Sequence, residues 1–343
     1  MPVALLDDAV EAYLGFRKDT GDRLKAALTA ERDFVLAHCL RGYFMMLFGQ
    51  RVMVSRAQRS LGAAQATVRA IGVTPREAAH VAALAAWVEG DLAGTTARWE
   101  AIAAEHPRDI LALKLGQYGR FYSGESERMR DVLAGALPAW DAGVPGYGFV
   151  LGCHAFGLEE TGDYAAAERA GREAVERNPA DIWAAHAVAH VFEMTGRPRE
   201  GIAWVDRLQS DWAECNNFAY HAFWHRCLFL IELGELVRVL ELYDREVRPE
   251  STDDLLDISN ALLGAFACGA RSIWRRWAVL SESTLPSGVR GRPSSVAYPS
   301  ERYPNVCRDP PRGVAEGQQG QRDRRQGGLK LKALTLGPGQ TLS

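Results

Sequence analysis

Two histidines and a glutamate recur at helical spacing within one short stretch of the sequence. His186 and His190 are four residues apart, and Glu193 follows three residues later. Because residues at i, i+4 and i+7 share one face of an α-helix, the three side chains can converge. Imidazole and carboxylate groups together suit a divalent metal such as zinc, and they also suit acid–base catalysis with the glutamate orienting a histidine.

The helix that would carry these residues belongs to a series marked by glycines. The intervals between successive glycines are 41, 34, 38, 34 and 38 positions, against about 34 residues for a tetratricopeptide repeat. In each repeat the glycine would end the first helix in a left-handed conformation, so that the second helix folds back. We therefore predict an all-α fold, an α-α superhelix of tetratricopeptide-like helix-turn-helix repeats. The turn glycines are Gly49, Gly90, Gly124, Gly162, Gly196 and Gly234.

The chain divides into a repeat array and a tail. We place the array at residues 1–280, beginning with a capping repeat at residues 1–33 whose turn is marked by Gly21-Asp22-Arg23. Residues 281–343 hold ten Lys or Arg against five Asp or Glu and no apolar periodicity. Such a segment buries too little surface to offset chain entropy, which predicts a disordered tail.

In this architecture the first helix of each repeat lines a concave groove. Counting back from the turn glycines places two histidines and a carboxylate of one repeat in the groove, together with residues of neighbouring repeats. His225 falls one step off the groove line. The predicted groove residues are Trp183, His186, His190, Glu193, Glu159, His221 and Tyr118.

Three interpretations of the histidines stay open from the residues alone. They could hydrogen-bond between stacked helices, contact a ligand, or perform metal or acid–base chemistry. The zincin motif H-E-x-x-H is absent, since Ala187 and Val188 follow His186. The sequence also contains no G-x-S-x-G element, phosphate loop or dinucleotide fingerprint.

The composition excludes several partners and compartments. A net charge of −3 and a pI near 6.3 argue against nucleic-acid binding by the repeat array. No window approaches the ~20 apolar residues that span a bilayer, so no membrane partner is expected. The six cysteines form no C-x-x-C pair, and acidic residues stand where a signal peptide needs basic ones. These features predict a cytoplasmic protein.

Several strings in the chain resemble the tetratricopeptide repeat protein 38 family. They include the stretch from Val144 to Glu160, and His186-Ala187-Val188-Ala189-His190 followed by Glu193-Met194. Further matches are 74–84, 201–204 and 211–214, so the resemblance covers about residues 1–263. It implies an α-α superhelix but no particular reaction or ligand. The family pattern continues past Leu263 with more repeats, and this sequence departs from it there. One hypothesis is that the reading frame has slipped.

The sequence thus favours a non-enzymatic scaffold that binds a protein segment, a peptide or a small ligand in its concave groove, through the seven groove residues named above. The alternative is a groove-centred enzyme or metal-dependent hydrolase. In that case His186, His190 and Glu193 are the candidate ligands of a divalent metal. No cofactor and no definite metal site are assigned from the sequence.

Overall fold

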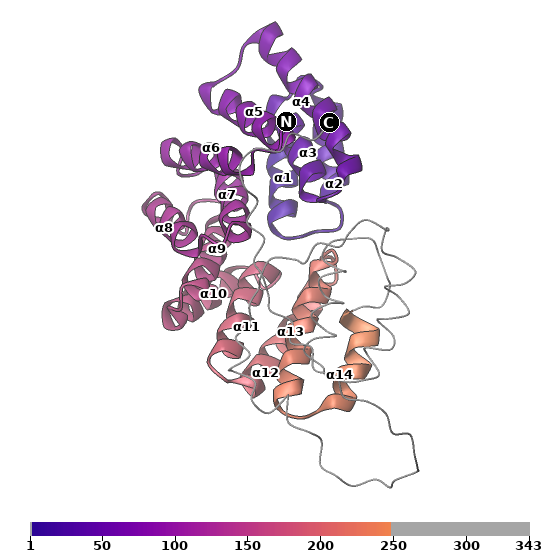
Figure 1. Cartoon of the computed structure of the whole chain (residues 1–343), viewed down its shortest axis with the longest axis vertical. Helices are drawn as coiled ribbons and strands as arrows, with labels where there is room; N and C mark the ends of the chain where they lie inside the picture. The colour runs from indigo at the N-terminus through magenta and orange to yellow at the C-terminus, as the bar shows by residue number, and fades with distance from the viewer. Residues whose placement is uncertain (1, 248–343) are drawn as a thin grey trace, which may run out of the picture. The chain divides into compact units, whose positions relative to one another are not determined.

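Fourteen α-helices make up the part of the chain that the computed structural model describes, residues 2–247 (Figure 1). Within these residues no β-strand forms, and the only strand-like contact is an isolated bridge between Arg17 and Cys215. The helices are α1 (Pro2–Leu14), α2 (Thr20–Ala30), α3 (Val35–Leu47), α4 (Arg51–Ile71), α5 (Pro75–Val88), α6 (Leu92–Glu105), α7 (Ile110–Tyr122), α8 (Ser126–Ala136), α9 (Tyr147–Glu160), α10 (Tyr164–Arg177), α11 (Ile182–Met194), α12 (Pro198–Leu208), α13 (Phe218–Glu232) and α14 (Leu236–Leu242), with short 3-10 turns at Leu137–Ala139 and Gln209–Trp212 and a π-helical turn at Tyr243–Val247.

Consecutive helices pair, and each pair packs on the next. α1 contacts α2, α3 contacts α4, and the same pairing continues to α13 and α14. The second helix of every pair also contacts the first helix of the following pair, which makes one continuous stack (Figure 1). The buried apolar side chains form clusters that each draw residues from several consecutive helix pairs. The predicted all-α fold of tetratricopeptide-like repeats is confirmed.

The turn between the helices of a pair has a repeated construction. All six glycines that mark the repeats have a positive φ, from 65° at Gly49 to 87° at Gly90. At the α9–α10 turn the amide of Gly162 donates to the carbonyl of Glu159, and the amide of Asp163 donates to the carbonyl of Leu158, both at 2.9 Å. The Asp163 carboxylate then accepts from the amide of Ala166 and caps α10. The Gly-Asp pair therefore ends one helix and begins the next.

The first helix pair does not follow the predicted turn. Gly21 lies inside α2, and the residue with the left-handed conformation in the α1–α2 connection is Phe16, at φ 53°. The prediction of a turn at Gly21-Asp22-Arg23 was wrong, because glycine is tolerated in the first turn of a helix. The conformation of Phe16 is set by contacts with residues about 200 positions away.

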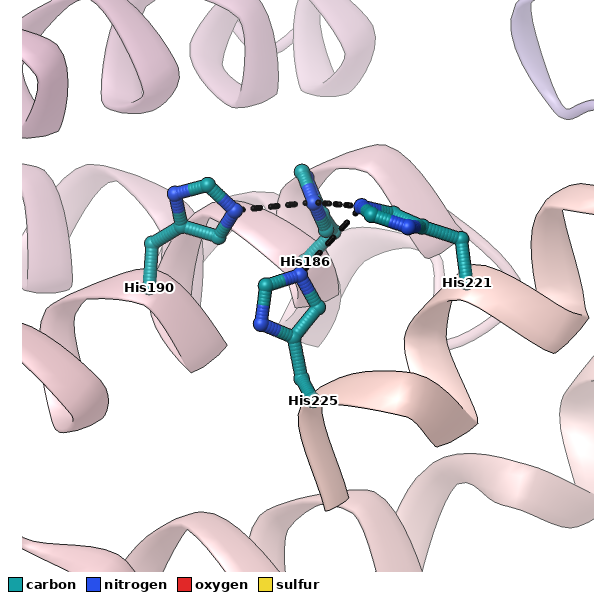
Figure 2. A group of neighbouring side chains, drawn as sticks. All are labelled: His186, His190, His221 and His225. Atoms are coloured by element: carbon teal, nitrogen blue, oxygen red, sulfur yellow. Dashed lines mark hydrogen bonds between the residues drawn. The ribbon is translucent and has the colours of Figure 1, made fainter. Parts of the chain in front are cut away.

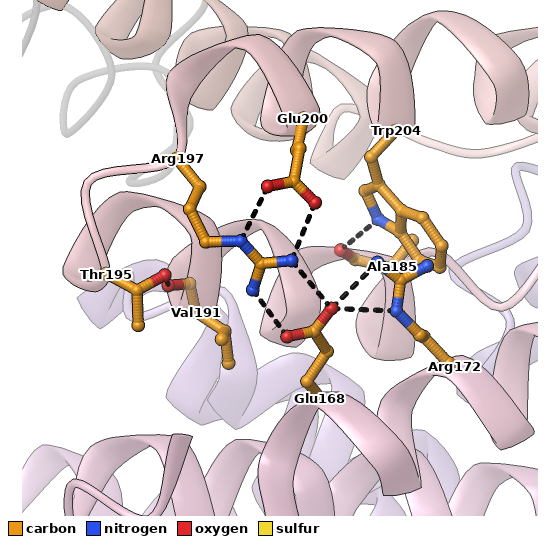
Figure 3. A network of polar contacts seen from close by, with 8 residues as sticks. All are labelled: Glu168, Arg172, Ala185, Val191, Thr195, Arg197, Glu200 and Trp204. Carbon is orange, nitrogen blue, oxygen red and sulfur yellow. Dashed lines mark hydrogen bonds and ion pairs between the residues drawn. The ribbon is translucent and has the colours of Figure 1, made fainter. Parts of the chain in front are cut away.

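Helix α11 is fixed in place by α10 and α12. On α12, the indole nitrogen of Trp204 donates to the carbonyl of Ala185 at 3.0 Å. Beside it, Glu168 of α10 accepts from Arg172 at 2.7 Å and from Arg197 at 2.6 Å (Figure 3). The hydrogen bond from Arg197 is the main reason that the pKa of Glu168 is lowered. The hydrogen bond of Trp204 thus joins α12 to α11, and the ion pair of Arg197 joins the α11–α12 turn to α10.

Some sequence predictions fall outside the described residues. They are the end of the repeat array after residue 247, the disordered tail at 281–343 and the slipped reading frame. Within residues 2–247, no helix combines the length and the apolar character needed to cross a lipid bilayer.

Candidate metal centre

Four histidines from two consecutive repeats meet between α11 and α13. His186 and His190 come from α11, and His221 and His225 come from α13. Each pair has the i, i+4 spacing, and the second pair follows the first by 35 residues, which is about one repeat. Figure 2 shows that the four imidazole rings point toward a common centre. One nitrogen from each ring lies within 4.8 Å of the others.

The contacts between these rings join Nε2 atoms only. The Nε2 of His186 lies 2.9 Å from that of His190 and 3.1 Å from that of His221, and the Nε2 atoms of His221 and His225 are 3.3 Å apart (Figure 2). An imidazole nitrogen has one in-plane position, which holds either a proton or a lone pair. Each Nε2 can therefore form one hydrogen bond, and at most two of the three contacts can be hydrogen bonds at the same time. A cation at the centre would accept all four lone pairs.

Two buried carboxylates orient the outer histidines. Oε2 of Glu159, on α9, lies 3.2 Å from Nδ1 of His190, and Oε2 of Glu193, on α11, lies 3.2 Å from Nδ1 of His225. Both carboxylates are 4% exposed or less. An Nδ1–H that donates to a carboxylate leaves the lone pair on Nε2, facing the centre. Carboxylates hold metal-ligating histidines in this way in many metalloproteins.

Burial, the neighbouring histidines and Glu159 shift the pKa of three of the four rings. Burial first, and then the neighbouring histidines, lower the pKa of His186 and of His225. Burial alone would also lower the pKa of His190, but the charge of Glu159 and its hydrogen bond raise it to about 9. Two of the rings are therefore neutral at pH 7 and can donate a lone pair. His190 would have to release a proton before it could bind a metal.

Aromatic side chains surround the histidines. The ring of Phe218 lies 5.2 Å from His186 and 5.6 Å from His221, centroid to centroid, and Trp183 lies 5.5 Å from His186. Phe156 packs on His186 from α9, and Trp224 stacks on His221 within α13. All four aromatic residues are less than 10% exposed. They exclude water from most of the centre and limit the movement of the imidazoles.

Of the seven groove residues predicted from the sequence, only three reach the centre itself. His186, His190 and His221 meet at the centre, while Glu159 and Trp183 border it. Glu193 does not join His186 and His190 as a third ligand, because its carboxylate faces His225 across the helix interface. Tyr118 lies farther away, with its ring 5.5 Å from that of Trp183.

Sequence reasoning missed His225. Counting back from the turn glycine placed His225 one position outside the predicted groove, whereas the structure brings a nitrogen of its ring to the centre. A usable signal was present, since His221 and His225 repeat the spacing of His186 and His190 one repeat later. Helices at equivalent positions of neighbouring repeats present equivalent faces, so the two pairs should have been treated as one set.

Tyr118 and Trp183 belong to a cage around a buried lysine. The Nζ of Lys114 lies 3.4 Å from the ring centroid of Trp183, 4.7 Å from that of Tyr118 and 5.4 Å from that of Phe16. Burial lowers the pKa of Lys114 to about 8. The cage is a cation–π arrangement inside the protein. It is next to the histidines because Trp183 contacts both Lys114 and His186.

The fold defines the class of this protein as a tetratricopeptide-like helical repeat protein. No protein-family profile matches the chain. Among solved structures, the chain is similar to a tetratricopeptide repeat protein from Parabacteroides merdae ATCC 43184. The two share 14% sequence identity with a TM-score of 0.46, and the match covers 77% of this chain and 98% of the other.

Proposed function

We propose that this protein is a helical repeat scaffold that binds one divalent transition-metal ion through Nε2 of four histidines, His186, His190, His221 and His225. The observation that carries the proposal is the convergence of one nitrogen from each ring within 4.8 Å, with three Nε2–Nε2 contacts of which protons can satisfy only two at a time. When each pair is hydrogen-bonded within its own helix, the His186–His221 contact between the helices has no proton, and a cation at the centre would bind all four nitrogens together.

The donor set indicates the class of metal. Neutral imidazoles suit zinc, copper, nickel, cobalt and iron, whereas magnesium and calcium prefer oxygen ligands. Zinc–nitrogen bonds of about 2.0–2.1 Å in a tetrahedral site place the nitrogens about 3.3–3.4 Å apart. Three of the six nitrogen pairs, at 2.9–3.3 Å, lie close to that spacing, and the other three lie within 4.8 Å, so small side-chain shifts would complete the site. Glu159 and Glu193 offset the charge of a divalent ion.

The centre is partly accessible. The side chain of His190 is 18% exposed, and His221 is half-buried, whereas His186 and His225 are buried. A ligand could therefore reach the ion from the side of His190 and His221. A tetrahedral ion with four histidine ligands leaves no open position for a coordinated water, so the metal-dependent hydrolase gains no support from this centre.

The other functional predictions from the sequence have no further support. None of the four histidines lines the cavity of about 580 Å³ bounded by Glu11, Tyr147 and Arg177. Binding of a protein segment in the groove, membership of the tetratricopeptide repeat protein 38 family and a cytoplasmic location remain predictions.

The test compares metal binding by the parent protein and by His190→Ala/His221→Ala, which removes one partly exposed ligand from each helix. His154→Ala is the matched control, since His154 is a half-buried histidine of α9 outside the cluster. After chelation and dialysis, each protein is titrated with Zn²⁺, Cu²⁺, Ni²⁺, Co²⁺ or Fe²⁺ and analysed by elemental mass spectrometry. Circular dichroism checks that all three are folded.

We expect the parent and His154→Ala to bind about one ion of at least one of these metals per chain. The double variant should bind none of that metal. A parent that binds none of the five ions would refute the proposal. Equal binding by the double variant would also refute it.

A further inference from the structure

The loop between α1 and α2 is bonded to the segment that leads into α13. The amide of Lys18 donates to the carbonyl of Glu214 at 3.0 Å, and the amide of Asn216 donates to the carbonyl of Phe16 at 2.6 Å. The ammonium of Lys18 also donates to the carbonyl of Ala213 at 2.8 Å. We call residues 15–18 together with residues 213–216 the clasp. It joins the first helix pair to the last two pairs of the described array.

Phe16 is held in the clasp in an uncommon conformation. Its φ of 53° is the only positive value at a non-glycine residue among those described. The left-handed conformation is unfavourable for a residue with a Cβ, because the Cβ crowds the following carbonyl oxygen. Such a conformation persists only where the surroundings impose it. Here they are the hydrogen bond to Asn216 and the aromatic ring of Phe218, which stacks on Phe16 with 4.3 Å between centroids.

The same aromatic contacts lead to the histidines. Phe218 is the first residue of α13, three positions before His221, and its ring packs on His186 and His221. Trp183, 5.8 Å from Phe16, packs on His186 as well. Phe16 thus rests on two aromatic rings that wall the four-histidine centre. A change in the spacing of α11 and α13 would move both rings under it.

We propose that the α1–α2 loop is a metal-responsive lid, which docks on the start of α13 when a divalent ion occupies the four-histidine centre and releases when the centre is empty. The inference rests on the proposed metal site. An ion holds α11 and α13 at one spacing, which keeps Phe218 and Trp183 in position for Phe16. Without an ion, the Nε2 atoms can all be hydrogen-bonded only within each helix, which leaves the His186–His221 contact between α11 and α13 unbonded. The two helices are then free to separate, and the left-handed strain at Phe16 favours release.

The coupling is reciprocal. If an ion strengthens docking of the loop by some factor, docking strengthens ion binding by the same factor. Loss of the Phe16 ring should therefore weaken metal binding, although Phe16 contacts no histidine in the centre. Typical coupling factors lie between about 5 and 150.

The first measurement is amide hydrogen exchange of the full chain, stripped of metal and then saturated with Zn²⁺. The reporters are the amides of Lys18 and Asn216, which donate the clasp hydrogen bonds. The control is the amide of Asp91, which donates to the carbonyl of Ala86 in the distant α5–α6 turn. We expect Zn²⁺ to slow exchange at both reporters by about tenfold or more and to leave Asp91 unchanged.

The second measurement is the Zn²⁺ dissociation constant of Phe16→Ala, with Phe48→Ala as the matched control. Phe48 is a 48% exposed phenylalanine that follows α3. We expect Phe16→Ala to weaken Zn²⁺ binding by the factor seen in hydrogen exchange, and Phe48→Ala to bind like the parent.

The outcomes separate the two proposals. A parent that binds no metal overturns both. Stoichiometric Zn²⁺ binding with unchanged exchange at Lys18 and Asn216 overturns the lid alone and leaves the metal centre standing. The exchange experiment on the parent decides the matter even if Phe16→Ala fails to fold.

Discussion

Replacing Glu193 with glutamine tests how the buried carboxylates act on the histidine centre. The carboxylate lies 3.2 Å from Nδ1 of His225, and the two side chains are 3% and 1% exposed. Glutamine keeps the shape and an acceptor oxygen but removes the charge that strengthens the His225 lone pair. Loss of such an outer partner typically weakens metal affinity 10–100-fold, which is about 1.4–2.8 kcal/mol. Glu159→Gln should have a similar effect through His190.

The double variant makes the prediction sharper. Glu193 and Glu159 hydrogen-bond to different ligands, but both charges act on His190, so the double variant should lose more affinity than either single variant, up to about 10²–10⁴-fold. Glu232→Gln, an exposed carboxylate of α13 outside the cluster, is the control and should bind like the parent. The assay is competition for Zn²⁺ with a chromophoric chelator at constant pH and ionic strength. If the double variant binds Zn²⁺ as tightly as the parent, the carboxylates do not support the ligands and the reasoning is wrong.

Two further predictions concern stability. Burial would raise the pKa of Asp109, but the hydrogen bond of His80 and the charge of Arg76 hold it well below its usual range. A lowered folded pKa contributes stability above the unfolded value of about 3.9, and that contribution is lost as the pH falls below it. Urea unfolding should show that Asp109→Asn lowers the free energy of unfolding by about 3 kcal/mol at pH 7 and by less at pH 3. An equal loss of unfolding free energy at both pH values would contradict this explanation. Gly162→Ala should lower the free energy of unfolding by about 1–2 kcal/mol, because residue 162 has a φ of 85°. Gly135→Ala should raise it by about 0.5–1 kcal/mol, because Gly135 lies within α8 and has open space where the Cβ would be. The same sign for both alanine variants would refute the explanation.

Local signals made most of the fold predictable from the sequence. A Gly-Asp pair such as Gly162-Asp163 ends one helix and caps the next through hydrogen bonds that reach no more than five residues along the chain. Such contacts depend only on nearby residue types. Gly21 failed as a turn signal for the opposite reason, since the α1–α2 turn is set by Phe16 and its partners near residue 215.

The candidate centre was predictable only in part. His186 and His190 follow from helical spacing within one helix, but the partner of Glu193 lies on another helix, and its identity depends on how α11 and α13 pack. Spacing alone made Glu193 a third ligand, whereas packing makes it the support of His225. The clasp has no sequence signal, because it consists mainly of backbone hydrogen bonds between distant loops.

The metal centre should stabilise a fold that forms without it. The four histidines join two repeats that already pack through apolar residues, among them Phe192, Trp204 and Phe229. This differs from a zinc finger, in which the metal replaces a core. When free Zn²⁺ is at 100 times the dissociation constant, its binding raises the free energy of unfolding by about 2.7 kcal/mol. This corresponds to a rise in Tm of about 5–10 °C. Chelation should therefore lower Tm by that amount and leave the helical circular dichroism at 20 °C unchanged. A chelated protein that is unfolded at 20 °C would show that the repeats depend on the metal, contrary to this argument.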